Sequence, residues 1–270
     1  MTQLAEQLRQ ELINIVMAIA NTRKGLNKLQ LQLIAVIAMV MDHTALFLLP
    51  HMKPYYVFHL FGRMTIVIMS YFVAEGYYKT HNLNKYIIRM GIFAAAAQLP
   101  FYLYENTEHF NGILHFIVDN FYSINVIFTL FIGLCLLAVI KSEQSWIFKL
   151  LAAFAAWAVT RHSDWGVYCL LWIIVFGLFR RQRVLAMCLA AAVVLLKVFV
   201  QIKPIVTILA AGGVVTNHSI IMAFVQLGGL FALIPLMLYN GEKGDAPRYG
   251  FYIFYPAHLL VLAVIMKFFL

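Results

Sequence analysis

From residue 29 to the C-terminus, the chain is a series of long apolar runs separated by short polar connections. A membrane-spanning helix needs about 20 consecutive, mostly apolar residues. Two runs within 147–179 are each short for a full crossing, so our count of nine spans has a range of eight to ten. We place the spans at 29–49, 56–77, 86–104, 121–140, 147–160, 164–179, 184–202, 219–239 and 250–270.

The composition agrees with this pattern. The chain is 63% hydrophobic and only 11% charged, whereas a soluble domain has about 25% charged residues. No polar stretch is long enough to form a soluble domain. We therefore predict an all-α, polytopic helical membrane bundle with a single transmembrane domain over 29–270.

The first 24 residues follow a different pattern. Leucine and isoleucine recur there at helical spacing, with glutamine and asparagine away from that stripe. This is typical of an amphipathic helix that lies on the membrane surface, so we predict an interfacial helix over 1–24. The stretch lacks the features of a signal peptide. The stripe consists of Leu4, Leu8, Leu12, Ile15 and Ile19.

Residues 203–218 contain one proline and two glycines, Pro204, Gly212 and Gly213. Glycine- and proline-interrupted membrane segments often mark binding sites. We expect this stretch to form a re-entrant segment.

Basic residues lie mostly in alternate short connections, which is the pattern that orients membrane proteins. With the N-terminus in the cytoplasm, the only basic residues in the outer connections are Lys53, Arg161 and Lys203. The net charge of +9 is then a consequence of topology, and nucleic acid is not an expected partner. The inner connections hold Arg23, Lys24, Lys28, Lys79, Lys85, Lys141, Lys149, Arg180, Arg181, Arg183, Lys243 and Arg248.

Ionisable residues inside the predicted spans are candidates for function, because charge within a bilayer is energetically unfavourable. Asp42 and His43 lie side by side in span one, Arg63 lies in span two and His258 in span nine. With the predicted orientation, most of these groups fall in the outer half of the membrane. This distribution predicts one site that opens outward.

Further polar residues accompany this set. Asn125 is near the outer end of span four, and Asp164 lies at the turn between the two short spans. Tyr255 shares a helix face with His258 at a spacing of three residues. His59 shares a face with Arg63, but its place near the outer end favours an interfacial residue over a catalytic one.

Glu75 departs from this pattern, because it lies near the inner end of span two. Two interpretations remain open. It forms a structural pair with Arg89 at the start of span three, or it contributes to a cytoplasmic binding site.

These residue types favour proton-transfer chemistry. A neutral histidine held by a carboxylate is a general base near neutral pH, and Arg63 is suited to bind a phosphate or an oxyanion. Neighbouring residues on a helix point about 100° apart, so Asp42 is as well placed to orient His258 or pair with Arg63 as to hold His43. The sequence has no nucleophile elbow, no phosphate-binding glycine loop and no close cluster of metal ligands, and we expect no metal.

Three functions fit the residues alone. The first is a membrane enzyme that acts on an outward-facing acceptor. The second is a proton-coupled transporter or flippase that uses the intramembrane residues as a relay. The third is a non-catalytic assembly factor in which the polar groups only hold the helices together.

The chain also resembles a known family, the TraX family. The resemblance rests on six segments in the family's order, which together cover most of the chain. They are Val40-Met41-Asp42-His43, Phe61-Gly62-Arg63-Met64, Ala74-Glu75-Gly76-Tyr77 with Lys79-Thr80-His81-Asn82, Asn125-Val126-Ile127-Phe128-Thr129-Leu130, Asp164-Trp165-Gly166-Val167 and Tyr255-Pro256-Ala257-His258-Leu259.

The resemblance implies an acetyltransferase of a bacterial-type plasma membrane, with acetyl-CoA as donor and a pilin-like peptide or an envelope glycan as the outward-facing acceptor. It implies a catalytic role for Asp42 with His43 or His258, and it does not decide between the two histidines. Direct transfer and an acetyl-histidine intermediate both fit it, and a homodimer is compatible with it. The matching positions for substrate are Arg63, Asn125, Asp164 and Tyr255, and those expected near the donor are Glu75, Lys79 and Arg89.

Overall fold

The computed structural model describes residues 6, 10, 25–48, 53–106, 123–163, 165–245 and 249–269. Within these ranges every regular element is a helix, and β-pairing is confined to isolated bridges. The interfacial helix predicted for 1–24 lies almost wholly outside the described residues. The helices are α2 (Lys28–Leu48), α3 (Lys53–Gly62), α4 (Met64–Lys79), α5 (Leu83–Glu105), α7 (Val126–Lys141), α8 (Trp146–Thr160), α9 (Gly166–Leu178), α10 (Arg183–Ala210), α11 (Asn217–Val225), the 3₁₀ helix η1 (Gln226–Ala232), α12 (Leu233–Met237) and α13 (Gly250–Phe269).

The predicted fold class is confirmed, since helices occupy each of the nine apolar runs. Three of them, α7, α8 and α9, are apolar but shorter than a full crossing. The chain is therefore a multi-pass helical membrane protein. The stretches long and apolar enough to cross a bilayer are Pro54–Lys79, Leu83–Glu105, Arg183–Ala210, Asn217–Met237 and Gly250–Phe268.

The prediction of a re-entrant segment at 203–218 is wrong. Helix α10 continues through Pro204 to Ala210, and a short turn then leads directly into α11. Proline removes one backbone donor from a helix, but α10 tolerates it near its C-terminal end, where the side chains are largely exposed. The two glycines belong to the turn, where Gly212 has a positive φ of 74°.

Two of the predicted spans are interrupted. Arg63 separates α3 from α4, and α11 passes through η1 before α12. The interruptions pack on each other, because η1 contacts both α3 and α4. Gly228 in η1 lies so close to the carbonyl of Leu60 that a β-carbon there would overlap it.

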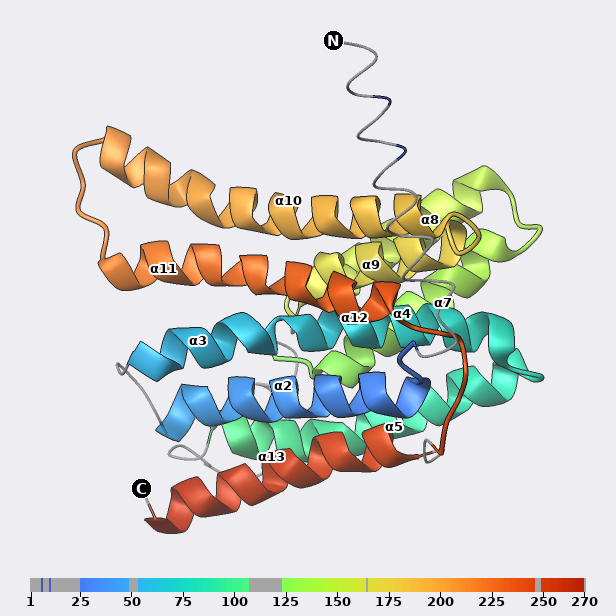
Figure 1. Cartoon of the computed structure of the whole chain (residues 1–270), viewed down its shortest axis with the longest axis horizontal. Coiled ribbons are helices and arrows are strands. Elements are labelled where there is room, and N and C mark those ends of the chain that lie inside the picture. Colours follow the sequence, from blue (N-terminus) through green and yellow to red (C-terminus); the bar gives the residue numbers. More distant parts are fainter. Residues whose placement is uncertain are drawn as a thin grey trace.

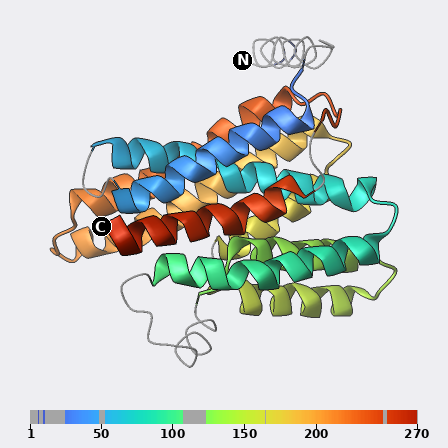
Figure 2. The ribbon, with the colours of Figure 1, turned by 90° about the horizontal axis from the view of Figure 1, so that it is seen from below.

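The helices run roughly along one axis of the molecule (Figure 1). α10 and α11 meet at one end of this axis, and α13 ends toward the same side (Figure 1). α13 lies between α2 and α5, far apart from both in sequence (Figure 2). This arrangement brings the end of the chain beside the first long helix.

Candidate functional site

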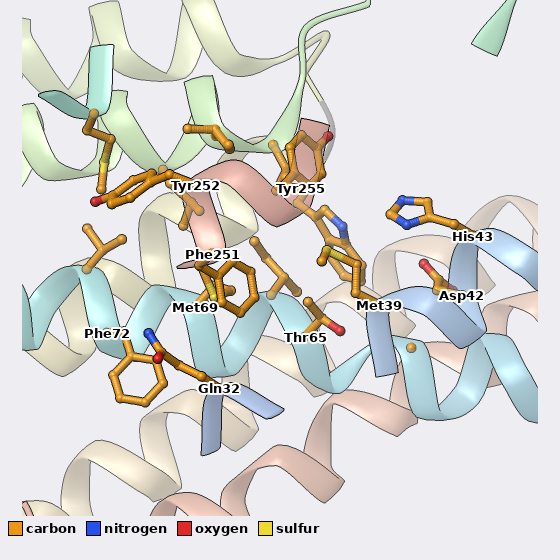
Figure 3. A pocket seen from close by; sticks show the side chains of 18 of the residues that line it. Gln32, Met39, Asp42, His43, Thr65, Met69, Phe72, Phe251, Tyr252 and Tyr255 are labelled. Atoms are coloured by element: carbon orange, nitrogen blue, oxygen red, sulfur yellow. The ribbon is translucent and has the colours of Figure 1, made fainter. Parts of the chain in front are cut away.

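An elongated cavity of about 150 Å³ lies between α2, α4, α5, α7 and α13. Gln32 and Phe72 lie at one end of it, and Asp42 and His43 lie at the other (Figure 3). Lys28 also lines it, and with a helical rise of about 1.5 Å per residue the cavity follows α2 for about 20 Å. Most of the wall is apolar, and the titratable groups gather at its two ends.

His43 and His258 form a pair across the contact between α2 and α13. His43 Nδ1 lies 2.9 Å from His258 Nε2, and His258 Nδ1 lies 3.0 Å from the carbonyl oxygen of Phe254. A carbonyl only accepts hydrogen bonds, so His258 Nδ1 carries the hydrogen and its Nε2 accepts from His43 Nδ1. In the neutral pair, His43 therefore keeps an unprotonated Nε2.

The two histidines differ in their exposure to the cavity. His43 lines it, whereas His258 lies behind His43 and is only 9% exposed. The free lone pair of His43 makes this residue the proton acceptor of the pair, and the Phe254 carbonyl fixes the orientation of both rings. The three-dimensional arrangement thus distinguishes two histidines that the sequence leaves equivalent.

Asp42 binds a different histidine from the one beside it in the sequence. Its Oδ1 lies 2.6 Å from His59 Nδ1 and 3.7 Å from a terminal nitrogen of Arg63. His59 is 4% exposed, so its side chain is buried within the bundle. Asp42 pairs with Arg63 only loosely, and its bonded partner is His59 rather than His258.

Gly62 allows this arrangement. A β-carbon at Gly62 would collide with the side chain of Asp42. The carboxyl group thus packs directly against backbone at the junction of α3 and α4. This contact places Asp42 within reach of both His59 and Arg63, which lie four residues apart on one face.

Trp165 and Tyr255 complete the cavity wall at this end. Tyr255 is 2% exposed, and its ring contacts that of His258 edge to face at 5.7 Å. Trp165 has a φ of 65°, a backbone conformation unfavourable for a side chain of this size. Such strain is often found at functional sites.

Lys197 is a residue that the sequence analysis missed. Its ammonium lies 3.4 Å from the centre of the Trp165 ring, and the Arg63 guanidinium lies 5.2 Å from the same ring. Cation–π contacts of this kind stabilise both partners. A lone lysine in the middle of the run 184–202 was the available signal.

Asn125 does not line the elongated cavity. Asn125 caps α7 by accepting from the amide of Phe128, and its Nδ2 donates to the Ala94 carbonyl and to Gln98 Oε1. Both hydrogens of the Asn125 amide are therefore used within the protein, which leaves none for an oxyanion. Asp164 lies outside the described residues.

A second cavity, of about 320 Å³, lies at the other end of α4 and contains Glu75 and Lys79. The predicted pairing of Glu75 with Arg89 is wrong, because Glu75 forms an ion pair with Lys79 at 2.8 Å. Arg89 packs instead over the ring of Tyr86. The cationic residues that line this second cavity are Lys79, Arg180 and Arg183. We call it the inner basic cavity, after the cytoplasmic side that the loop charges predict for these residues.

The two cavities are neighbours. Phe72 lines the elongated cavity and Tyr239 lines the inner basic cavity, and their rings are in contact at 6.0 Å. The ammonium of Lys28 also contacts this ring, 5.1 Å from the Phe72 ring centre.

The described residues contain no group of three histidine, cysteine, aspartate or glutamate side chains able to hold a metal ion. The side chains at the histidine end can transfer protons through imidazole and stabilise negative charge through Arg63.

Comparison with known proteins identifies the family of this chain. A family model described as "TraX protein" matches residues 27–266. The chain is also similar to the probable fimbrial assembly protein FimC, serogroup H1, of Dichelobacter nodosus, with 31% identity over 241 residues, or 86% of this chain and 93% of that protein. No solved structure matches. The family match covers most of the chain, including both histidines and the residues around Arg63, and the protein belongs to the TraX family.

Proposed function

We propose that this protein is an integral-membrane acetyltransferase that transfers an acetyl group from acetyl-CoA to an acceptor on the opposite side of the membrane. The observation that carries the proposal is the His43–His258 pair at one end of the elongated cavity. It supplies a general base beside an apolar passage.

His43 is the base in this proposal. Its Nε2 takes the proton of the acceptor amine or hydroxyl as the new bond to the acetyl carbon forms. The carbon–sulfur bond then breaks, and the departing thiolate takes the same proton from His43. His258 stabilises the imidazolium by accepting its Nδ1 hydrogen, and the Phe254 carbonyl holds His258 in the tautomer that this requires.

Arg63 stabilises the oxyanion that develops on the acetyl carbonyl. Its Nε is buried and has no hydrogen-bond partner within the described part of the chain. A buried donor without a partner is unfavourable, so an oxygen of the substrate would satisfy it. Tyr255 and Trp165 shape the pocket around the acetyl group.

The donor enters from the inner basic cavity. Its phosphates bind Lys79, Arg180 and Arg183, and its thioester arm follows the elongated cavity toward His43. Glu75 holds Lys79 in place through their ion pair. Arg89 has no part in this proposal, because it packs on Tyr86 away from the inner basic cavity.

The acceptor approaches from the outer side. The similar protein from Dichelobacter nodosus is named as a fimbrial assembly protein, so a pilin-like peptide amine is the first acceptor to test. An envelope glycan hydroxyl requires the same base and the same oxyanion donor, and it is the second.

The test is to incubate the purified protein with acetyl-CoA labelled in the acetyl group and with cell-envelope extract, and to identify labelled products by mass. We expect a labelled acceptor with wild-type protein and none with His43→Ala. Label on a histidine of the protein without acceptor would replace direct transfer by a covalent route. Proton-driven solute uptake into proteoliposomes, with no acetyl transfer, would overturn the proposal in favour of a transporter.

A further inference from the structure

One carboxylate oxygen of Asp42, at the histidine end of the cavity, lies near two side chains that can donate hydrogen bonds, His59 and Arg63. Asp42 Oδ1 lies 2.6 Å from His59 Nδ1 and 3.7 Å from the Arg63 guanidinium. The first distance is that of a strong hydrogen bond, and the second is that of an ion pair without one. His59 therefore holds the oxygen that Arg63 would otherwise bind.

The hydrogen bond between His59 and Asp42 also determines what kind of contact Arg63 makes with His59. His59 Nδ1 carries a hydrogen, because it donates to the carboxylate. The Arg63 nitrogen 3.3 Å from it carries hydrogens as well, so this contact is not a hydrogen bond. Arg63 is thus held near Asp42 by charge alone.

The surrounding backbone prevents these groups from moving apart. Gly62 lies against the side chain of Asp42, and Gly228 lies against the backbone of Leu60. The end of α3 is therefore packed between α2 and η1. Because the backbones are packed this closely, side-chain hydrogen bonds determine which donor Asp42 takes.

We propose that His59 is a positioning residue that keeps Arg63 available to the substrate by occupying Asp42. Without His59, Arg63 and Asp42 would close into the two-point pair that arginine and carboxylates form readily. The guanidinium would then turn from the oxyanion toward the carboxylate. This inference rests on the proposed function, since it names a residue that serves the same site.

The charged and titratable groups around His59 agree with this role. Asp42 faces it from α2, Arg63 from the junction of α3 and α4, and the Tyr55 ring packs against it edge to face at 4.4 Å. On the outer side, His218 of α11 hydrogen-bonds Tyr56 at 3.0 Å. His59 does not line the elongated cavity, and it acts through Asp42 and Arg63.

The experiment compares wild type, His59→Leu and His59→Asn in detergent or proteoliposomes, with labelled acetyl-CoA as donor. Asparagine keeps an N–H donor near the position of Nδ1, and leucine keeps only volume. We expect His59→Leu to lower kcat about 100-fold, the scale of losing one oxyanion donor, with KM for acetyl-CoA changed less than threefold. We expect His59→Asn to recover at least a tenth of wild-type kcat with an unchanged pH profile.

The outcomes separate this inference from the proposed function. No transfer by wild type would refute the proposed function itself. Wild-type kcat in His59→Leu would overturn the positioning role alone. If His59→Asn were as inactive as His59→Leu and had lost one limb of the pH profile, His59 would carry a proton and our inference would be wrong. His81→Leu, at an exposed histidine, is the matched control, and the Asn variant keeps the test decisive should the Leu variant fail to insert.

Discussion

The histidine end of the elongated cavity and the inner basic cavity both contain several ionisable residues, but they hold these residues differently. At the histidine end, which the loop charges predict to be the outer one, His43 is bonded to His258 and His59 to Asp42. At the inner end, Lys79 and Arg180 are exposed, and only Glu75 offers a carboxylate. The outer groups are bonded to one another inside the protein, whereas Lys79 and Arg180 keep exposed charge, although Glu75 and the Gly241 carbonyl also bind Lys79.

On the proposed function, this difference corresponds to a division between catalysis at one end and donor binding at the other. Catalysis requires groups held within a fraction of an ångström, and internal partners provide that. Binding a phosphate requires mainly positive charge, which exposed lysine and arginine side chains supply. Variants at the outer end should therefore change kcat, and variants at the inner end should change KM for the donor.

The largest effect is expected at His43. His43→Ala removes the base that faces the cavity, and we expect kcat to fall about 1,000-fold, within the usual range for a general base. His258→Ala leaves that base in place but loses its orientation, and we expect a smaller loss of about 100-fold. Acetyl transfer by purified variants measures both, with His81→Ala as control. A larger loss in His258→Ala than in His43→Ala would reverse our assignment of the two histidines.

Gly62→Ala should come next. The added methyl group collides with Asp42 and pushes the carboxylate away from His59 and Arg63. We expect kcat to fall at least tenfold and the midpoint of thermal unfolding to decrease, because overpacking destabilises by about 1–3 kcal/mol. Gly91→Ala, at a helical glycine that faces the Phe131 ring, is the matched control. Normal kcat in Gly62→Ala would show that the close contact with Asp42 has no catalytic role.

At the inner end, we expect Arg180→Gln to raise KM for acetyl-CoA about tenfold, which corresponds to about 1.4 kcal/mol, while kcat stays near wild type. The effect should shrink at high salt, since exposed charges are screened. Lys85→Gln is the control, because Lys85 is exposed and does not line the inner basic cavity. A reduced kcat with unchanged KM would contradict the division between the two ends.

The smallest effect on activity is expected at Asn125. Its amide caps α7 and joins it to α5 through Gln98. Asn125→Ala should lower the stability by about 1–2 kcal/mol, the scale of a lost helix cap, and leave kcat per folded molecule nearly unchanged. Thermal unfolding followed by an assay of the folded fraction measures both. A strong loss of kcat in well-folded Asn125→Ala would return this residue to the catalytic site.

The sequence by itself determined the fold class and the set of candidate residues. Apolar runs of span length leave a helical membrane bundle as the one reasonable architecture, and ionisable residues within them are conspicuous for the same reason. Asp42, His43, Arg63 and His258 were all identified in this way, and three of them line the elongated cavity. The TraX relationship was also visible in the order of short motifs, and the family match confirms it.

Only the tertiary structure decided which residues pair. His43 and His258 are 215 residues apart, and they meet because α13 packs beside α2. Asp42 selects His59 rather than a histidine nearer in sequence, because Gly62 and Gly228 allow backbones to approach at that point. Periodicity along a helix predicts which face a residue occupies. The partner of that face depends on how separate helices pack. Hydrogen bonds between helices depend on the resulting distances, which no local sequence pattern contains.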